Sequence, residues 1–555
     1  MAEWSNALAW KASRPHKGLG SSNLPLSEAE RSGRRTTALS RRARAGDIAL
    51  IVTVAALCRA ATFWTQVGDW DVGFYLIVAR EVVHGHLPYV TAWEYRPPGL
   101  FVLLAAALAV FGSPGIAIAA LGLVCVGATA LALYAIGGCF RTHGRTVGLV
   151  AALLYATTSI EDGGLAGNTE IIFAPLLVWA IAIVVRRGVE RTRMTARDVI
   201  VAGVLLGGAL QMKLMVIPEA AFAIALAAVW TGSGVRVAAS LAALTVLPFA
   251  LEAIVYAWSN ALGDLYDANV GATLRRVGLS TSAPSDNLRR ILAQPLALAP
   301  ASALALIAPF AAAREPRASS DRRLAIVLGL WLLVEALTIA LVREFNDHQF
   351  LQLLPPLTLL AGYATARIAS APRAARALAI AVVLLSFGLH GYYQAVGAGR
   401  LAYHRSLLHD AGWRTANLDR IAAAIRAEPA QTRTLFVVGE TPIVYALADA
   451  PIPTRLPFSL YLTDREMWPL TAVDGRVEVA RILATRPTFI VRSDSRFHLD
   501  PAVDALVTGA LRARYRPVQT FDHDVLYRLR AGVDEKTSMA TFSSVPSART
   551  LETSA

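Results

Sequence analysis

The sequence has 555 residues, of which 55% are hydrophobic and only 17% charged, with a formal net charge of +13 and a mean hydropathy of +0.47. Soluble domains carry roughly 25% charged residues, so this composition excludes an ordinary soluble protein. The basic residues lie in short loops between apolar runs, which is typical of membrane topology signals and not of a nucleic-acid partner. The three cysteines, Cys58, Cys125 and Cys139, show no metal-ligand spacing.

The N-terminal segment, residues 1–46, is polar and ends in Arg41-Arg42-Ala43-Arg44. Such a segment cannot bury a core, and we expect a disordered basic tail in the cytoplasm. A signal peptide is the alternative, but the basic run begins far from the N-terminus and no small-residue cleavage site follows Trp64. Residues 47–66 are predicted to be the first transmembrane helix.

A polar stretch follows, containing Asp69 and Asp71. Residues 72–84 have the pattern of an amphipathic helix that lies on the membrane surface. The run 97–112 opens with Pro97-Pro98 and offers too few apolar residues to cross a bilayer. We therefore expect it to lie flat at the outer surface.

Further apolar runs of near-spanning length follow, and with the first helix they predict about eleven spans. They are residues 114–138, 146–160, 168–185, 198–212, 214–231, 235–258, 291–313, 323–342, 349–366 and 374–394. If 97–112 does not cross, the arginine-rich loops fall inside and the acidic first loop falls outside, as the positive-inside rule requires. Counting 97–112 as a span would reverse this. The expectation is a multi-pass protein of the plasma (inner) membrane, with a transmembrane domain over 47–395.

The pattern changes after residue 395. Short β-type runs at 434–439, 488–491 and 518–529 alternate with helical stretches at 443–450 and 477–484. This alternation predicts a small α/β domain over 396–533 with a partly parallel sheet. An odd number of spans places it outside the cytoplasm. Residues 534–555 are rich in Ser and Thr, and we expect them to be disordered.

The first candidate carboxylates are Asp69 and Asp71, because ionisable residues at a membrane boundary are functional candidates. Either could instead cap the helix that follows. For Asp69, helix capping and a functional role are equally favoured, so Asp69 stays a candidate second carboxylate. Asp71 is favoured as the functional residue, because Tyr75 and the segment Glu94-Tyr-Arg-Pro-Pro-Gly99 supply a polar, rigid frame.

Two further candidates lie later in the chain. Glu170 falls about one turn inside a predicted helix and faces the bundle, although an N-terminal capping box around Asn168 is the alternative. Lys213 interrupts an apolar stretch at the outer boundary. It could extend to water, bind a phosphate or pair with Glu170.

Arg343 and His348 precede another apolar run at the same face. A carboxylate pair beside cationic groups suits transfer of a sugar from a phosphate leaving group, with one carboxylate deprotonating the acceptor and cations stabilising the phosphate. The sequence has no Walker-type loop and no GxGxxG.

With these motifs the sequence resembles the GT-C membrane glycosyltransferases. It is most similar to the family-39 type, which includes protein O-mannosyltransferases and the lipid A aminoarabinose transferase. The resemblance rests on Asp71-Val-Gly-Phe-Tyr75 with Arg96-Pro-Pro-Gly99, on Asn168-Thr-Glu170, on Lys213, and on His348 with Leu354-Pro-Pro356. Val72 stands where the family has Glu, and Arg96 stands where it has Lys. Any role that needs two adjacent carboxylates is therefore in doubt.

The resemblance implies an inverting transfer from a polyprenyl-phosphate sugar donor, at the outer face, to an acceptor that is a protein, lipid or glycan. Asp71 would be the base or would orient the acceptor, and Glu170 would support it or help to hold a cation. Lys213 and His348 would neighbour the lipid phosphate, with Tyr75, Arg96 and Arg343 in the same substrate-binding set. Participation of a divalent metal varies across the superfamily and is left open.

Two other functions compete with this one. A transporter or flippase for a lipid-linked substrate would place ionisable residues near the midplane and often shows internal repeats, whereas here the charges gather at the outer boundary. A non-catalytic assembly factor would use the outer domain to bind cell-envelope components.

Overall fold

The computed structural model describes residues 28–67, 69–161, 163–277, 284–396, 410–439, 441–493, 499–521 and 523–531. Residues 1–50 and residues 51–555 form two compact units. The described part of the first unit belongs to helix α2 (Glu28–Arg59). Residues 28–46, expected to be disordered, are therefore helical, and their many Ala and Arg residues are good helix formers. The expected disorder of residues 1–27 and 534–555 lies outside the described residues.

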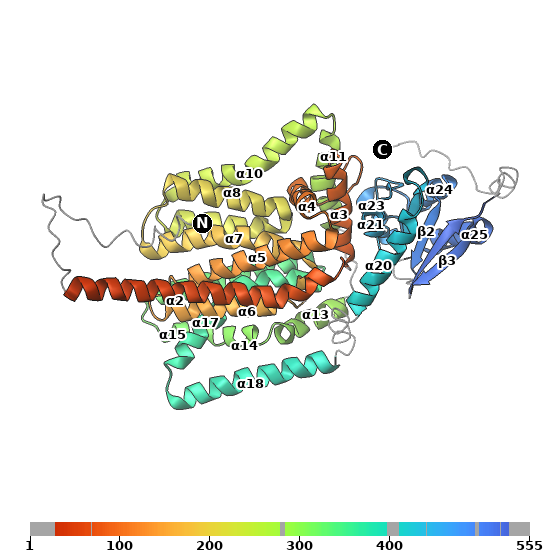
Figure 1. The fold of residues 1–555 in the computed structure, drawn as a ribbon. Helices are drawn as coiled ribbons and strands as arrows, with labels where there is room; N and C mark the ends of the chain where they lie inside the picture. The colour runs from red at the N-terminus through yellow and green to blue at the C-terminus, as the bar shows by residue number, and fades with distance from the viewer. Residues whose placement is uncertain are drawn as a thin grey trace. The chain divides into compact units, whose positions relative to one another are not determined.

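The larger unit begins with a helical part (Figure 1). Its elements in chain order are η1 (Ala60–Trp64), α3 (Trp70–Val83), α4 (Pro98–Phe111), α5 (Pro114–Gly137), α6 (Gly144–Thr158), η2 (Gly164–Ala166), α7 (Thr169–Glu190), α8 (Ala196–Met212), η3 (Leu214–Val216), α9 (Ile217–Trp230), α10 (Gly234–Trp258), α11 (Leu262–Tyr266), η4 (Asp267–Gly271), α12 (Ala272–Val277), α13 (Pro284–Ala297), α14 (Ala301–Ala305), α15 (Ala308–Ala313), α16 (Ser320–Val342), η5 (Asp347–Leu353), α17 (Leu354–Ala369) and α18 (Arg373–Val396).

The helical part is a multi-pass bundle. Within the described ranges five helices are long and apolar enough to cross a membrane, and a sixth span is formed if the pair Asn287–Ala297 and Ala301–Ala313, bent by 85°, counts as one. The expected number of about eleven is not confirmed, because several predicted spans are short: α6 has 15 residues and α17 has 16. A span needs about 20 residues to cross the hydrocarbon core.

Helix α7 is the centre of this bundle. Of its most apolar stretch 83% is buried inside the protein, against 11% for α10. Helix α5 packs against both α6 and α7, and α17 packs against α6. The start of α7, where Glu170 lies, is therefore enclosed by other helices.

Helix α3 is enclosed by other elements of the protein, and its expected place at the membrane surface stays a prediction. Every residue from Val72 to Ala79 is buried, because α3 packs on α4 on one side and on α21 (Val444–Leu447) on another. A Cβ atom at Gly73 would lie 3.1 Å from the Cβ atom of Ile443, so the small residue allows this close approach. The expected short helix at 97–112 is confirmed as α4.

The remaining elements form the C-terminal α/β part, which also belongs to the larger unit. They are α20 (Asp410–Arg426), η6 (Ala430–Thr432), β1 (Leu435–Val438), α21, α22 (Leu460–Thr463), η7 (Arg465–Met467), α23 (Trp468–Thr471), α24 (Gly475–Ala484), β2 (Phe489–Ser493), α25 (Pro501–Arg514), β3 (Tyr515–Phe521) and β4 (Asp524–Leu529).

The sheet has the order β1-β2-β4-β3. Strands β1 and β2 are parallel, whereas β4 is antiparallel to both β2 and β3. The partly parallel sheet expected from the sequence is confirmed. The single strand expected over 518–529 is instead two antiparallel strands, because β3 ends at Phe521 and β4 begins at Asp524.

The contact between α5 and α6 yields a stability prediction. A Cβ atom at Gly137 would lie 2.2 Å from the Cα atom of Gly148, whereas a Cβ at Gly127 on the same helix meets nothing within 4 Å. We expect Gly137→Ala to destabilise the protein by about 1–3 kcal/mol, the usual cost of overpacking. Gly127→Ala should change stability by less than about 1 kcal/mol. Thermal unfolding of both variants in detergent checks this, and equal melting temperatures would contradict the packing described here.

Candidate active site

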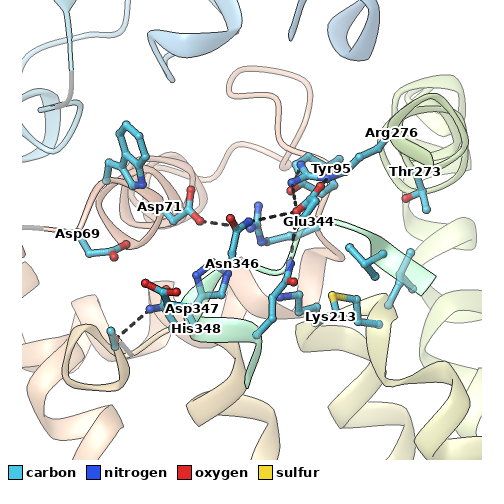
Figure 2. A pocket seen from close by; sticks show the side chains of 18 of the residues that line it. Asp69, Asp71, Tyr95, Lys213, Thr273, Arg276, Glu344, Asn346, Asp347 and His348 are labelled. Carbon is cyan, nitrogen blue, oxygen red and sulfur yellow. Dashed lines mark hydrogen bonds and ion pairs between the residues drawn. The ribbon is translucent and has the colours of Figure 1, made fainter. Parts of the chain in front are cut away.

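A cavity of about 670 Å³ lies between the helical part and the C-terminal part. Its wall carries acidic side chains, basic side chains and apolar residues, and Figure 2 shows Asp71 on one side of it and Glu344, Asn346 and His348 on the facing side. The acidic residues are Asp69, Asp71, Glu161, Glu344 and Asp347, and the basic residues are Arg96, Lys213, Arg276, Arg290 and His348. Of the residues predicted from the sequence, Asp69, Asp71, Arg96, Lys213 and His348 therefore line one cavity.

The two aspartates differ in role at the start of α3. Asp69 caps the helix, because its carboxylate accepts a hydrogen bond of 3.0 Å from the Val72 N–H. The capping alternative thus holds for Asp69. Asp71 lies in the first turn with its side chain 25% exposed, and its carboxylate faces the cavity (Figure 2). Of the two aspartates, Asp71 is therefore the one whose carboxylate does not cap α3.

Arg96 is the cation beside Asp71. Its Nη2 atom lies 3.7 Å from Asp71 Oδ2, and its Nη1 donates a hydrogen bond of 2.6 Å to Glu94 Oε1. The guanidinium group also lies over the ring of Tyr75, 4.4 Å from the centroid. Tyr75 is buried and acts as a support for Arg96, so its predicted place in the substrate-binding set is indirect. Tyr95 contributes a second ring, with its centroid 4.8 Å from the guanidinium carbon.

Arg276 and Glu344 form a second charged pair in the cavity wall, which the sequence did not predict. Arg276, in α12, forms two hydrogen bonds to the Glu344 carboxylate, at 2.6 and 2.9 Å, and also donates to the Tyr95 hydroxyl. Burial tends to raise the pKa of Glu344, but the Arg276 charge outweighs it and holds that pKa below its usual value. The sequence offered no periodic signal for Arg276, because α12 has only six residues.

Glu170 and Lys213 form a buried ion pair. Lys213 Nζ donates a hydrogen bond of 2.5 Å to Glu170 Oε1, and the Glu170 side chain is 0% exposed. This is the pairing that the sequence left open among three alternatives. Lys213 reaches the cavity but Glu170 is not in its lining, so Glu170 positions Lys213 and does not meet a substrate there. The alternative considered for this segment, a capping box at Asn168, is absent, since the Asn168 side chain makes no capping hydrogen bond to the α7 backbone.

Near the end of α16, the residue that lines the cavity is one position later than predicted. Arg343 is exposed and is not in the cavity lining, whereas Glu344 is buried and is. Arg343 adopts a left-handed conformation with φ of 60° and ends α16, so the chain turns there and directs the next residue inward. His348 lines the cavity, and burial lowers its pKa against the opposing effect of Glu170.

No group of three or more His, Cys, Asp or Glu side chains that could hold a metal ion occurs among the residues the structure describes. We therefore assign no residue set to a divalent metal.

The pKa of Asp69 gives a pH prediction. Burial, with the adjacent Asp71 carboxylate as a second cause, raises that pKa to about 7. A raised pKa means that the folded state binds a proton which the unfolded state releases, so this residue lowers stability as the pH rises between about 4 and 7. Asn caps a helix as well as Asp does, so Asp69→Asn should keep the cap and remove the titration.

We expect the melting temperature of Asp69→Asn to match that of the wild type near pH 4 and to exceed it at pH 8. Thermal unfolding of both proteins across that range measures the difference. A difference that stays constant with pH would contradict the raised pKa.

Comparisons with known proteins agree with this architecture. Residues 95–258 match the family described as dolichyl-phosphate-mannose-protein mannosyltransferase. No curated protein matches the sequence.

Solved structures match over most of the chain. The crystal structure of ArnT from Cupriavidus metallidurans bound to undecaprenyl phosphate is similar with a TM-score of 0.58 and 14% identity, over 88% of this chain and 98% of that chain. The apo structure of the same protein matches with a TM-score of 0.54 and 15% identity, over 87% and 98%. The oligosaccharyltransferase AglB from Archaeoglobus fulgidus, in complex with an inhibitory peptide and a dolichol-phosphate, has a TM-score of 0.48 and 11% identity, over 89% and 75%.

At such low identity the ArnT structures establish the shared fold. Together with the family match over residues 95–258, that fold confirms the resemblance to the GT-C membrane glycosyltransferases of the family-39 type.

Proposed function

We propose that this protein is a glycosyltransferase that moves a sugar from a polyprenyl-phosphate donor to a hydroxyl group of an acceptor. The observation that carries the proposal is the cavity itself, which places the partly exposed Asp71 carboxylate in the same space as Lys213, Arg276 and His348. The shared fold with ArnT, whose crystal structure holds undecaprenyl phosphate, supports the class of donor.

The proposed chemistry follows from the charges. Asp71 accepts the proton of the acceptor hydroxyl, whose oxygen then attacks the anomeric carbon of the donor. The bond between that carbon and the phosphate oxygen breaks, and the polyprenyl phosphate leaves with both electrons. A single displacement of this kind inverts the anomeric configuration. Cations fixed in the cavity wall stabilise the leaving phosphate, because they need no reorganisation during the reaction.

The cavity wall also suits a lipid donor. Besides its charged residues it includes Leu214 and Met215 of η3, Ile217 at the start of α9, and Leu341 and Val342 at the end of α16. Helix α16 is one of the candidate spans, so an isoprenoid chain could pass from the cavity along this apolar side. Arg290 and Lys213 would then meet the phosphate at the polar end.

The orientation belongs to the same proposal. The positive-inside rule places the arginine-rich loops, and with them the N-terminus, in the cytoplasm. The cavity and the C-terminal α/β part then lie outside the cytoplasm, at the outer face of the plasma (inner) membrane. The acceptor is a protein, lipid or glycan.

The test is sugar transfer from a panel of radiolabelled polyprenyl-phosphate sugars by wild type and Asp71→Asn. Loss of a general base typically costs about 10²–10⁴-fold in rate, so we expect at least a 100-fold decrease with similar expression. Asp267→Asn is the matched control, because the Asp267 side chain is 41% exposed, pairs with Arg275 and does not line the cavity.

Equal turnover in wild type and Asp71→Asn would remove Asp71 from the mechanism. Movement of intact donor lipid across the membrane without release of sugar would identify a transporter instead.

A further inference from the structure

The C-terminal part supplies one wall of the cavity. Phe458, Leu460, Tyr461 and Met467 line the same space as Asp71. The connection between the two parts is made by specific bonds, including a hydrogen bond of 2.6 Å from the Trp93 N–H to the Arg455 carbonyl oxygen. Residues of the C-terminal part therefore lie within the reach of the charged groups in the cavity wall.

Tyr461 makes a direct contact with this charged network. Its hydroxyl donates a hydrogen bond of 3.0 Å to Glu94 Oε2. Its ring is held by edge-to-face contacts with Phe74, at 5.8 Å between centroids, and with Trp93, at 5.4 Å. The ring packing fixes the direction of the hydroxyl group, so the hydrogen bond is separable from the packing of the side chain.

Glu94 is fully buried and both of its carboxylate oxygens are used. Oε1 accepts from Arg96 Nη1 at 2.6 Å, and Oε2 accepts from Tyr461. A buried carboxylate that loses a donor must find another one, since an unsatisfied buried charge is costly. The guanidinium of Arg96, which already bonds Glu94 through Nη1, carries a further donor group in Nη2.

Arg96 is shared between two carboxylates, at 2.6 Å from Glu94 and at 3.7 Å from Asp71. While Tyr461 satisfies one oxygen of Glu94, the Nη2 group of Arg96 stays directed to Asp71. Without Tyr461, Glu94 would compete with Asp71 for that group. The position of Arg96 relative to Asp71 thus depends on a residue of the C-terminal part.

We propose that Tyr461 and Glu94 are positioning residues that hold Arg96 beside Asp71, so that the C-terminal part sets the geometry of the catalytic carboxylate. The effect on catalysis depends on the proposed glycosyltransferase function, but the link from Tyr461 to Asp71 does not.

The kinetic test compares Tyr461→Phe with Tyr445→Phe. Tyr445 is a matched control because it is a buried tyrosine of the same part whose hydroxyl accepts a hydrogen bond of 2.9 Å from the Val437 N–H, and it does not line the cavity. We expect Tyr461→Phe to lower kcat roughly 10-fold, the size expected for one hydrogen bond to a charged group. The KM for the lipid donor should stay unchanged, and Tyr445→Phe should leave kcat unchanged. An unchanged kcat in Tyr461→Phe, or an equal loss in both variants, would overturn the proposal.

A second measurement does not need activity. Tyr461 and Asp71 are joined through Glu94 and Arg96, so the effects of Tyr461→Phe and Asp71→Asn on the melting temperature should be non-additive, whereas those of Tyr445→Phe and Asp71→Asn should add. Additive effects in the first pair would refute the link even if transfer activity is present. Non-additive effects in a protein without transfer activity would keep the link and reject the glycosyltransferase function.

Discussion

A buried guanidinium group is the constraint on which the candidate site depends. Arg96 must satisfy its charge away from water, and it does so with the Glu94 carboxylate, the Asp71 carboxylate and the rings of Tyr75 and Tyr95. The chain on both sides is fixed as well, because the Tyr89 hydroxyl donates to the Arg96 carbonyl oxygen at 2.5 Å and Pro97-Pro98 begins α4. An arginine held from so many directions leaves little freedom to the carboxylate beside it, which is the arrangement that preorganised catalysis requires.

The cavity exists because several helices end at the same side of the bundle. Asp71 comes from the first turn of α3, Lys213 follows the end of α8, and Glu344 follows the end of α16. The central helix α7 begins at this level and places Glu170 under Lys213. Charged groups are therefore presented where backbone polar groups at helix ends are also unpaired. The C-terminal part then covers this level and supplies aromatic side chains to its wall.

Much of this site could be predicted from the sequence. Asp71 and Arg96 lie in a polar segment between apolar runs, Lys213 interrupts one and His348 precedes one. An ionisable residue in such a place needs a partner or a function. The Glu170–Lys213 pair was among the alternatives for the same reason. Arg276 and Glu94 were missed as site residues, because Arg276 bonds Glu344 and Glu94 bonds Tyr461, and these partners are distant in sequence. Arg343 was chosen in place of Glu344, since a left-handed residue at the end of α16 reverses the direction of the side chains that follow. The predicted number of about eleven spans is not confirmed, because apolar character marks a buried short helix and a membrane span alike.

The most direct test of the account is an experimental structure of the protein in lipid with a polyprenyl phosphate bound. We expect the phosphate inside the cavity, among Lys213, Arg276 and His348 and facing Asp71, with the isoprenoid chain along Leu214, Ile217 and Leu341. A phosphate bound outside this cavity, or a lipid that enters from the opposite ends of α7 and α16, would contradict it.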